Sequence, residues 1–253
     1  MSSFMLGVIV FVLVSSGAFF GIWLSQTVPP QHRDSRTHDT IKLGIGMISV
    51  LASLVLGLLT ASVKSAYDTT NSEIRSFAAD LMLLNDTLEE YGPAAAAARA
   101  TLRSYTARAI QDQWPDEPDA GIRTDDKDSG KLLEQVRLQI FDLPGDSPRA
   151  VGLRTNATSM IATLLQTRSL LIARSGTSIQ PVFLWVLICW ITLIFVSFGF
   201  NAPRNPIVTI AFLTCAGALG SSIFLISEMD SPFDGVIMIS SHAMRVALAH
   251  MTG

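Results

Sequence analysis

Four long apolar stretches, grouped as two pairs, dominate the pattern of hydrophobic and polar positions along the chain. None of them contains Asp, Glu, Lys or Arg, and they cover residues 4–25, 43–63, 182–200 and 207–227. A helix needs roughly 20 apolar residues to cross the hydrocarbon core of a bilayer. Because lipid cannot hydrogen-bond to the backbone, such stretches cross it as helices. The pattern predicts an all-α integral membrane protein with four transmembrane helices in a 2 + 2 arrangement.

Residues 64–180, between the two pairs, are too polar to cross lipid. At their start, apolar residues recur in steps of three and four, as in a coiled-coil seam, and continue the second apolar helix to Tyr91. Gly92-Pro93 predicts a break, and further helices are expected over 94–114, 131–141 and 148–174, with a loop over 116–130. The seam comprises Ile74, Phe77, Leu81, Leu84, Leu88 and Tyr91.

The segment therefore forms an extramembrane helical bundle, and four regions follow. Residues 1–63 are the first transmembrane pair, 64–180 the extramembrane helical domain, 181–227 the second transmembrane pair, and 228–253 a C-terminal segment. Only 15% of residues are charged, against about 25% in soluble domains.

Composition and motifs exclude several function classes. The net charge of −3 argues against nucleic acid as a partner, since nucleic-acid binders carry a basic surface. The chain has no GxSxG, HExxH, P-loop or Rossmann pattern, so we predict no enzyme activity and no cofactor. Asp125, Asp126 and Asp128 resemble part of a calcium loop but lack its Gly and Glu, and no metal site is predicted.

Small residues recur every four positions in three of the apolar stretches. In the second they are Ser49, Ser53, Gly57 and Ala61, which share one narrow stripe of a helix. Such a stripe either packs closely against another helix or lines a pore, and both interpretations stay open. Gly17 and Gly21 in the first stretch, and Ala216 and Gly220 in the fourth, predict close helix packing.

Acidic residues follow the fourth stretch at the expected membrane surface. Glu228, Asp230 and Asp234 flank Pro232 and Phe233. Carboxylates at a pore mouth select cations. Alternatively, these acids cap helix ends and contact basic side chains of residues 64–180.

Two segments together resemble the bacterial bestrophin-like membrane family, a domain of unknown function. The first is Lys42 to Asp68, which holds the run Leu56-Gly57-Leu58-Leu59-Thr60-Ala61-Ser62; the second consists of Phe195 to Asn205 and then Ile223 to Gly235, which ends in Glu228-Met229-Asp230-Ser231-Pro232-Phe233-Asp234-Gly235. The resemblance covers nearly the whole chain apart from 114–130. Bestrophins themselves are pentameric anion or cation channels with a similar helix layout. Their acidic calcium clasp is missing here, since 235–241 contains no acid, so calcium gating is not implied.

The resemblance implies an oligomeric ion channel, with the lipid bilayer, further copies of the chain and inorganic ions as partners. The alternative is a non-conducting scaffold or sensor whose helical insert binds a partner. Basic residues near the membrane are almost evenly divided between the two sides, so charge does not decide the topology. From the resemblance we expect a multi-pass protein of the bacterial inner membrane, with insert and termini in the cytoplasm.

Overall fold

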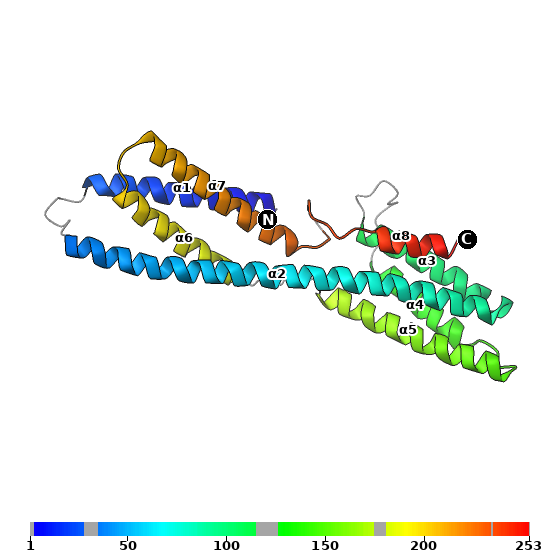
Figure 1. Ribbon diagram of the computed structural model, residues 1–253. Helices are drawn as coiled ribbons and strands as arrows, with labels where there is room; N and C mark the ends of the chain where they lie inside the picture. The colour runs from blue at the N-terminus through cyan, green and yellow to red at the C-terminus, as the bar shows by residue number, and fades with distance from the viewer. Residues whose placement is uncertain (1–2, 28–34, 115–125, 175–180, 234, 253) are drawn as a thin grey trace. The chain divides into compact units, whose positions relative to one another are not determined.

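The computed structural model describes residues 3–27, 35–114, 126–174, 181–233 and 235–252. Within these ranges every regular element is a helix, which confirms the predicted all-α class (Figure 1). The elements are α1 (Ser3–Thr27), α2 (Ser35–Tyr91), the 3₁₀ turn η2 (Pro93–Ala95), α3 (Ala96–Gln113), α4 (Asp126–Phe141), α5 (Pro148–Arg174), α6 (Pro181–Asn201), α7 (Pro206–Met229) and α8 (His242–His250).

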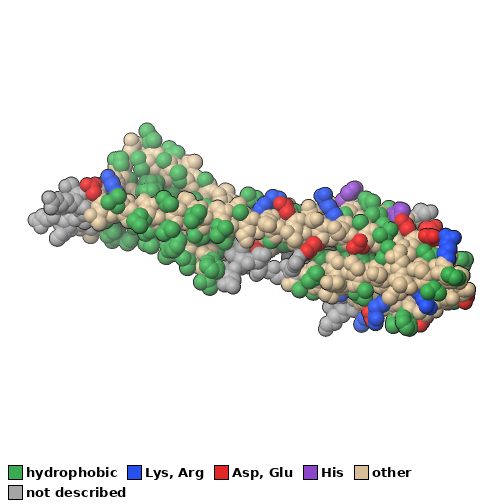
Figure 2. All heavy atoms as spheres, turned by 60° about the horizontal axis from the view of Figure 1, so that its bottom comes forward, with side chains coloured by type: hydrophobic (Ala, Val, Ile, Leu, Met, Phe, Trp, Pro, Cys, Tyr) green, Lys and Arg blue, Asp and Glu red, His purple; other side chains and the backbone are tan. Residues whose placement is uncertain are grey.

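The chain divides into two compact units that alternate along the sequence. The apolar unit comprises residues 1–67 and 177–237, and the insert unit comprises 68–176 and 238–253. α2 contributes its first part to the apolar unit and its last part to the insert unit. In Figure 2, hydrophobic side chains cover most of the visible apolar unit, whereas charged side chains gather over the insert unit.

Among the described residues of the apolar unit, four helices are long and apolar enough to cross a membrane, namely α1, the first part of α2, α6 and α7. α1 packs against both α6 and α7. Ala52 and Val63 of α2 join the same core. Other buried members of this core are Val10, Val14, Ala18, Leu187, Ile188, Ile191, Ile223 and Ile226.

Glycines allow α1 and α6 to approach backbone to backbone. A Cβ on Gly21 would lie 2.0 Å from the carbonyl oxygen of Val196, and a Cβ on Gly199 would lie 2.0 Å from that of Ala18. No side chain fits at either position. The close packing predicted from the spacing of Gly17 and Gly21 is therefore confirmed, with α6 as the partner helix.

A second close approach joins α1 and α7. A Cβ on Gly220 would lie 2.8 Å from the carbonyl oxygen of Gly7, and Ala216 is fully buried. Beside this crossing, a shallow groove of about 290 Å³ is lined mainly by aromatic side chains and glycines. The packing role predicted for Ala216 and Gly220 is confirmed.

In the insert unit, the predicted seam of α2 is buried. Ile74, Phe77, Leu81, Leu84 and Leu88 are each at most 5% exposed, while Tyr91 at the end of the helix is half-buried. The helix stops at Gly92, whose φ of 98° lies in the left-handed region that favours glycine. Beyond η2, α4 packs on α3 and α5, and α8 packs on α3.

Two helices begin earlier than the sequence predicted. α2 begins at Ser35 and α4 at Asp126, so residues 126–130 of the expected loop are helical; residues 116–125 lie outside the described residues. Gly130 is tolerated inside α4 because it packs against Arg168 of α5: a Cβ there would lie 3.2 Å from the guanidinium Nη1. Tertiary packing thus outweighs the weak helix propensity of glycine.

Candidate functional site

The small-residue stripe of α2 faces away from the core of its own protomer. Ser53, Gly57 and Ala61 are exposed and Ser49 is half-buried. No atom lies within 4 Å of the position that a Cβ on Gly57 would occupy. A different face, which includes Ile45, Ile48, Ala52, Val55, Leu56, Leu59 and Val63, packs inward. Within the described protomer, the stripe is not a packing surface.

The outward surface of α2 has two chemically different sides. At 100° per residue, Gly46, Ser49, Ser53, Gly57 and Thr60 lie together on one side, here called the small-residue face, and Val50 and Ala61 lie at its border. The other side carries large exposed apolar side chains, which are Leu43, Met47, Leu51, Leu54 and Leu58.

Hydroxyl groups on the small-residue face bond to their own helix. The Ser49 hydroxyl donates to the carbonyl of Ile45 at 2.8 Å, and the Thr60 hydroxyl donates to that of Leu56 at 2.8 Å. Such back-bonding satisfies the donors without a partner helix. The face is therefore slightly polar but uncharged, which suits contact with another helix or with water.

α2 is also the apolar helix least covered by its own protomer. In the most apolar 18-residue window of α2, 6% of residues are buried, against 39% for α1 and α6 and 17% for α7. The rest of its surface must meet lipid, another molecule or water.

Glu228, predicted as one of three surface acids, is buried in the last turn of α7. The residue is 4% exposed. Its Oε2 accepts hydrogen bonds from the backbone N–H of Val236 at 2.6 Å and of Ile237 at 3.3 Å. Backbone donors to a carboxylate are charge-assisted and strong. By accepting these two bonds, the carboxylate stabilises the turn that follows α7.

Gly235 makes room for that carboxylate. Its φ is 100°, and a Cβ there would lie 2.4 Å from Oε2 of Glu228. Every other residue is disfavoured by both the backbone conformation and the contact. The sequence carries a signal for this pairing, a Gly seven residues after an acid at a helix end.

The other residues of the acidic segment are less buried. Asp230 caps the C-terminus of α7, where its backbone N–H donates to the carbonyl of Ile226 at 3.1 Å. Pro232 and Phe233 follow in the turn and are half-buried. Asp234 lies outside the described residues. Glu228 and Asp230 therefore share one helix end but have different surroundings.

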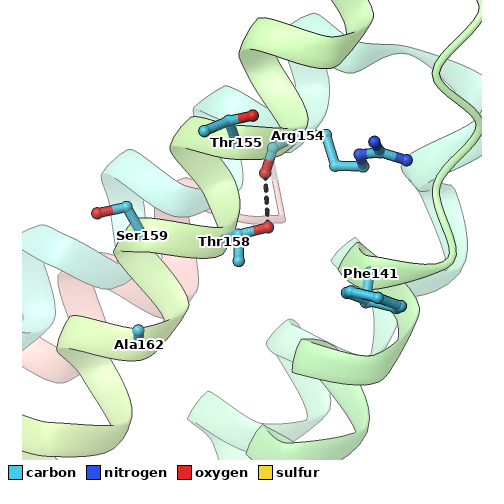
Figure 3. A pocket seen from close by; sticks show the side chains of 6 residues that line it. All are labelled: Phe141, Arg154, Thr155, Thr158, Ser159 and Ala162. Carbon is cyan, nitrogen blue, oxygen red and sulfur yellow. Dashed lines mark hydrogen bonds between the residues drawn. The ribbon is translucent and has the colours of Figure 1, made fainter.

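The insert unit has an open groove of about 550 Å³ between α4 and α5 (Figure 3). Phe141 forms one wall, and the α5 residues Arg154, Thr155, Thr158, Ser159 and Ala162 form the other. Thr158 donates to the carbonyl of Arg154 at 2.7 Å, and the guanidinium of Arg154 donates to the carbonyl of Leu143 at 2.9 Å. The groove thus has an exposed aromatic ring on one wall and short hydroxyl side chains on the other.

Among the described residues, no group of three or more His, Cys, Asp or Glu side chains is placed to hold a metal ion.

The structure also brings together residues that lie far apart in the sequence and belong to no motif. In the insert unit, the indole N–H of Trp114 donates to the carbonyl of Ile239 at 2.7 Å. Their separation of 125 positions leaves no local pattern by which sequence analysis would find the pair.

Several solved structures share the fold of this chain. A leucine-to-threonine variant of a bacterial bestrophin homolog from Klebsiella pneumoniae matches with a TM-score of 0.69 and 12% identity, over 98% of this chain and 99% of that one. A crystal structure of the same homolog, phased by zinc anomalous scattering, matches with a TM-score of 0.68 and 12% identity, over 96% of each chain. A proline-to-alanine variant described as a membrane protein matches with a TM-score of 0.65 and 14% identity, over 97% of each chain.

The curated proteins contain no match to this sequence. The model of one family, described as the Bestrophin-like domain, matches residues 12–244. That range includes all four apolar helices in part or whole, the insert and the turn held by Glu228. The chain belongs to the Bestrophin-like family of membrane proteins.

Proposed function

We propose that this protein is an oligomeric ion channel in which the small-residue face of α2, from several copies, surrounds the pore. The observation that carries the proposal is the low burial of the apolar part of α2, where only 6% of the residues in the most apolar window are buried. The large side chains around Leu54 suit lipid. A face of Gly, Ser and Thr suits close approach of helices or contact with water.

The proposed arrangement in the membrane has two crossings, α1 and α2, then the insert, then two crossings, α6 and α7. Both termini and the insert then lie on one side, which we assign to the cytoplasm of a bacterium. Family membership supports this arrangement, because the bestrophins that the chain resembles are channels with a similar helix layout. Inorganic ions are the proposed cargo, and further copies of the chain are the proposed partners.

Thiol block of ion flux tests the pore assignment. In a background of Cys189→Ser and Cys215→Ala, Ser53→Cys protein is reconstituted in liposomes and treated with a water-soluble methanethiosulfonate reagent. A thiol in a water-filled pore reacts, and the added group reduces flux. Leu54→Cys is the matched control, because it is adjacent in sequence but lies on the side with large apolar residues. Equal effects at both positions would contradict the pore assignment.

The acids at the end of α7 bear on ion selectivity, and we propose that Asp230 favours cations near the pore mouth. Glu228 is less suited to this role, because its carboxylate is buried and holds backbone N–H groups. Asp230→Asn is expected to shift the cation/anion permeability ratio. Glu228→Gln is expected to lower thermal stability instead. A changed ratio in Glu228→Gln alone would reverse this assignment.

A second candidate is a non-conducting scaffold whose insert binds a partner protein. Its support is the exposed apolar surface of α4, where Leu138 is 53% and Phe141 74% exposed, beside the groove of Figure 3. Size in detergent separates the two candidates. A monomer or dimer without flux in liposomes favours the scaffold, and a larger ring with flux favours the channel.

A further inference from the structure

We propose that residues 228–251 form a linkage that couples the end of α7 to the insert unit, so that a change at either end reaches the other. As a way of controlling ion flow, the linkage rests on the proposed channel function. As a mechanical coupling it stands on the contacts of two anchors and the length of chain between them.

The first anchor is the turn after α7. Oε2 of Glu228 holds the N–H groups of Val236 and Ile237, at 2.6 and 3.3 Å. Because this carboxylate is buried, release of the turn would leave a charge without its donors, which is costly. The turn therefore moves together with the last residues of α7.

The second anchor is the indole of Trp114, at the end of α3. Its Nε1–H donates to the carbonyl of Ile239 at 2.7 Å, and Trp114 and Ile239 are 5% and 1% exposed. An indole has a single donor, and burial of both partners makes loss of the bond expensive. Ile239 therefore moves together with α3.

Further contacts extend the second anchor along α8. Met244, Ala247 and Met251 are buried. The guanidinium of Arg103 on α3 donates to the carbonyl of Met251 at 2.5 Å. Nε2 of His250 lies 2.8 Å from Oδ1 of Asp86 on α2. The Trp114 bond before α8, apolar burial along α8 and the two contacts at its C-terminal end hold the segment 239–251 on the insert unit.

The chain between the anchors has almost no slack. Glu228 holds the N–H of Ile237, Trp114 holds the carbonyl of Ile239, and only Met238 lies between. Two residue steps reach about 7 Å when fully extended. Any motion that carries the Ile239 carbonyl more than about 7 Å from the Ile237 amide must break one anchor or pull on α7. By linkage, the coupling acts equally in both directions.

Hydrogen exchange on the full-length protein in lipid nanodiscs tests the coupling. Trp114→Phe removes the donor but keeps an aromatic side chain. It is expected to speed exchange in α8, and also at the amides of Val236 and Ile237, by about fivefold or more. In the reciprocal experiment, Glu228→Gln is expected to speed exchange in α8. Trp185→Phe, which changes an exposed indole of α6, is the matched control and leaves both regions unchanged.

Faster exchange in α8 with no change at Val236 and Ile237 would overturn the proposal. If Trp114→Phe fails to fold, Arg103→Gln replaces it, because it removes only the contact to the Met251 carbonyl. The same pattern at smaller amplitude supports the coupling, and acceleration confined to α8 overturns it.

Ion flux separates the linkage from the proposed function. If the unmodified protein conducts in liposomes, Trp114→Phe is expected to change its initial flux by about fivefold or more, and Trp185→Phe is not. Unchanged flux in Trp114→Phe would contradict the proposal that the linkage controls ion flow. Absence of flux in the unmodified protein would reject the channel, while the exchange data still decide whether the coupling exists.

Discussion

At the scale of single residues, glycines of the apolar helices have opposite surroundings in this protein. Gly21 meets the backbone of α6, whereas Gly44 and Gly57 face open space. A methyl group added at Gly21 must therefore push two helices apart, while one added at an open position only improves helix propensity. The same substitution is expected to change stability in opposite directions.

We predict that Gly21→Ala lowers the free energy of unfolding by about 1–3 kcal/mol, the usual cost of overpacking. Gly44→Ala is expected to leave it unchanged or raise it by up to about 1 kcal/mol. Thermal unfolding of both variants in one detergent measures the difference. Equal stability of the two variants would mean that α1 and α6 adjust without cost.

A surface pair on α4 gives a prediction of pH dependence. Glu134 accepts hydrogen bonds from Arg137, at 2.9 Å from Nε to Oε2, and this bond lowers the pKa of Glu134 below its ordinary value. A lowered pKa in the folded state stabilises the protein above the ordinary pKa. The contribution disappears as the pH falls through the lowered value. Arg137, whose pKa is raised, stays charged throughout.

Glu134→Gln is therefore expected to reduce thermal stability slightly at neutral pH and not at all in acid. The effect is small because both side chains are exposed and screened by solvent. Unfolding temperatures of both proteins across an acid titration provide the measurement. A difference that persists once Glu134 is protonated would point to packing rather than charge.

At the scale of elements, α2 combines three surfaces in one helix. One packs into the apolar core, one carries large side chains and one carries small residues. Further along, its seam around Leu81 enters the core of the insert unit. A substitution in the open small-residue face should leave the fold of the protomer intact and affect only what meets that face.

We predict that Gly57→Leu disrupts assembly or blocks ion flux while the helix content of the protomer is unchanged. Gly44→Leu, also in open space but on another side of the helix, is the control. Size in detergent, circular dichroism and liposome flux are compared for the two variants. If Gly57→Leu changes none of these, the small-residue face meets lipid.

At the scale of the whole molecule, the membrane topology decides on which side the insert lies. The positive-inside count is nearly even, so the proposal of a cytoplasmic insert rests on the resemblance to bestrophins. Ser104 on α3 and Arg204 between α6 and α7 are both exposed. In the proposed topology they lie on opposite sides of the membrane.

In a background without Cys189 and Cys215, Ser104→Cys is expected to resist a membrane-impermeant thiol reagent in intact cells. Arg204→Cys is expected to react. Opening the inner membrane should then expose Ser104→Cys. The opposite labelling pattern would reverse the topology and place the insert outside the cytoplasm.

Sequence alone determined the features that depend on local periodicity. The four uncharged stretches predicted apolar helices, the steps between Ile74 and Leu88 predicted the buried seam, and Gly92-Pro93 predicted the break after α2. Each is encoded within a few helical turns, because burial in lipid or in a bundle imposes a repeating pattern on neighbouring residues. Motifs spread along most of the chain likewise carried the family resemblance.

Only the tertiary structure decided which of the patterned residues meet a partner. Gly21 and Gly57 look alike in sequence, yet only Gly21 is packed within the protomer. Gly130 lies inside a helix because Arg168 packs against it, and Glu228 is buried because its carboxylate receives the backbone of Val236. Trp114 and Ile239 meet across 125 positions. Such contacts depend on which faces come together in space, and helical periodicity specifies a face without specifying its partner.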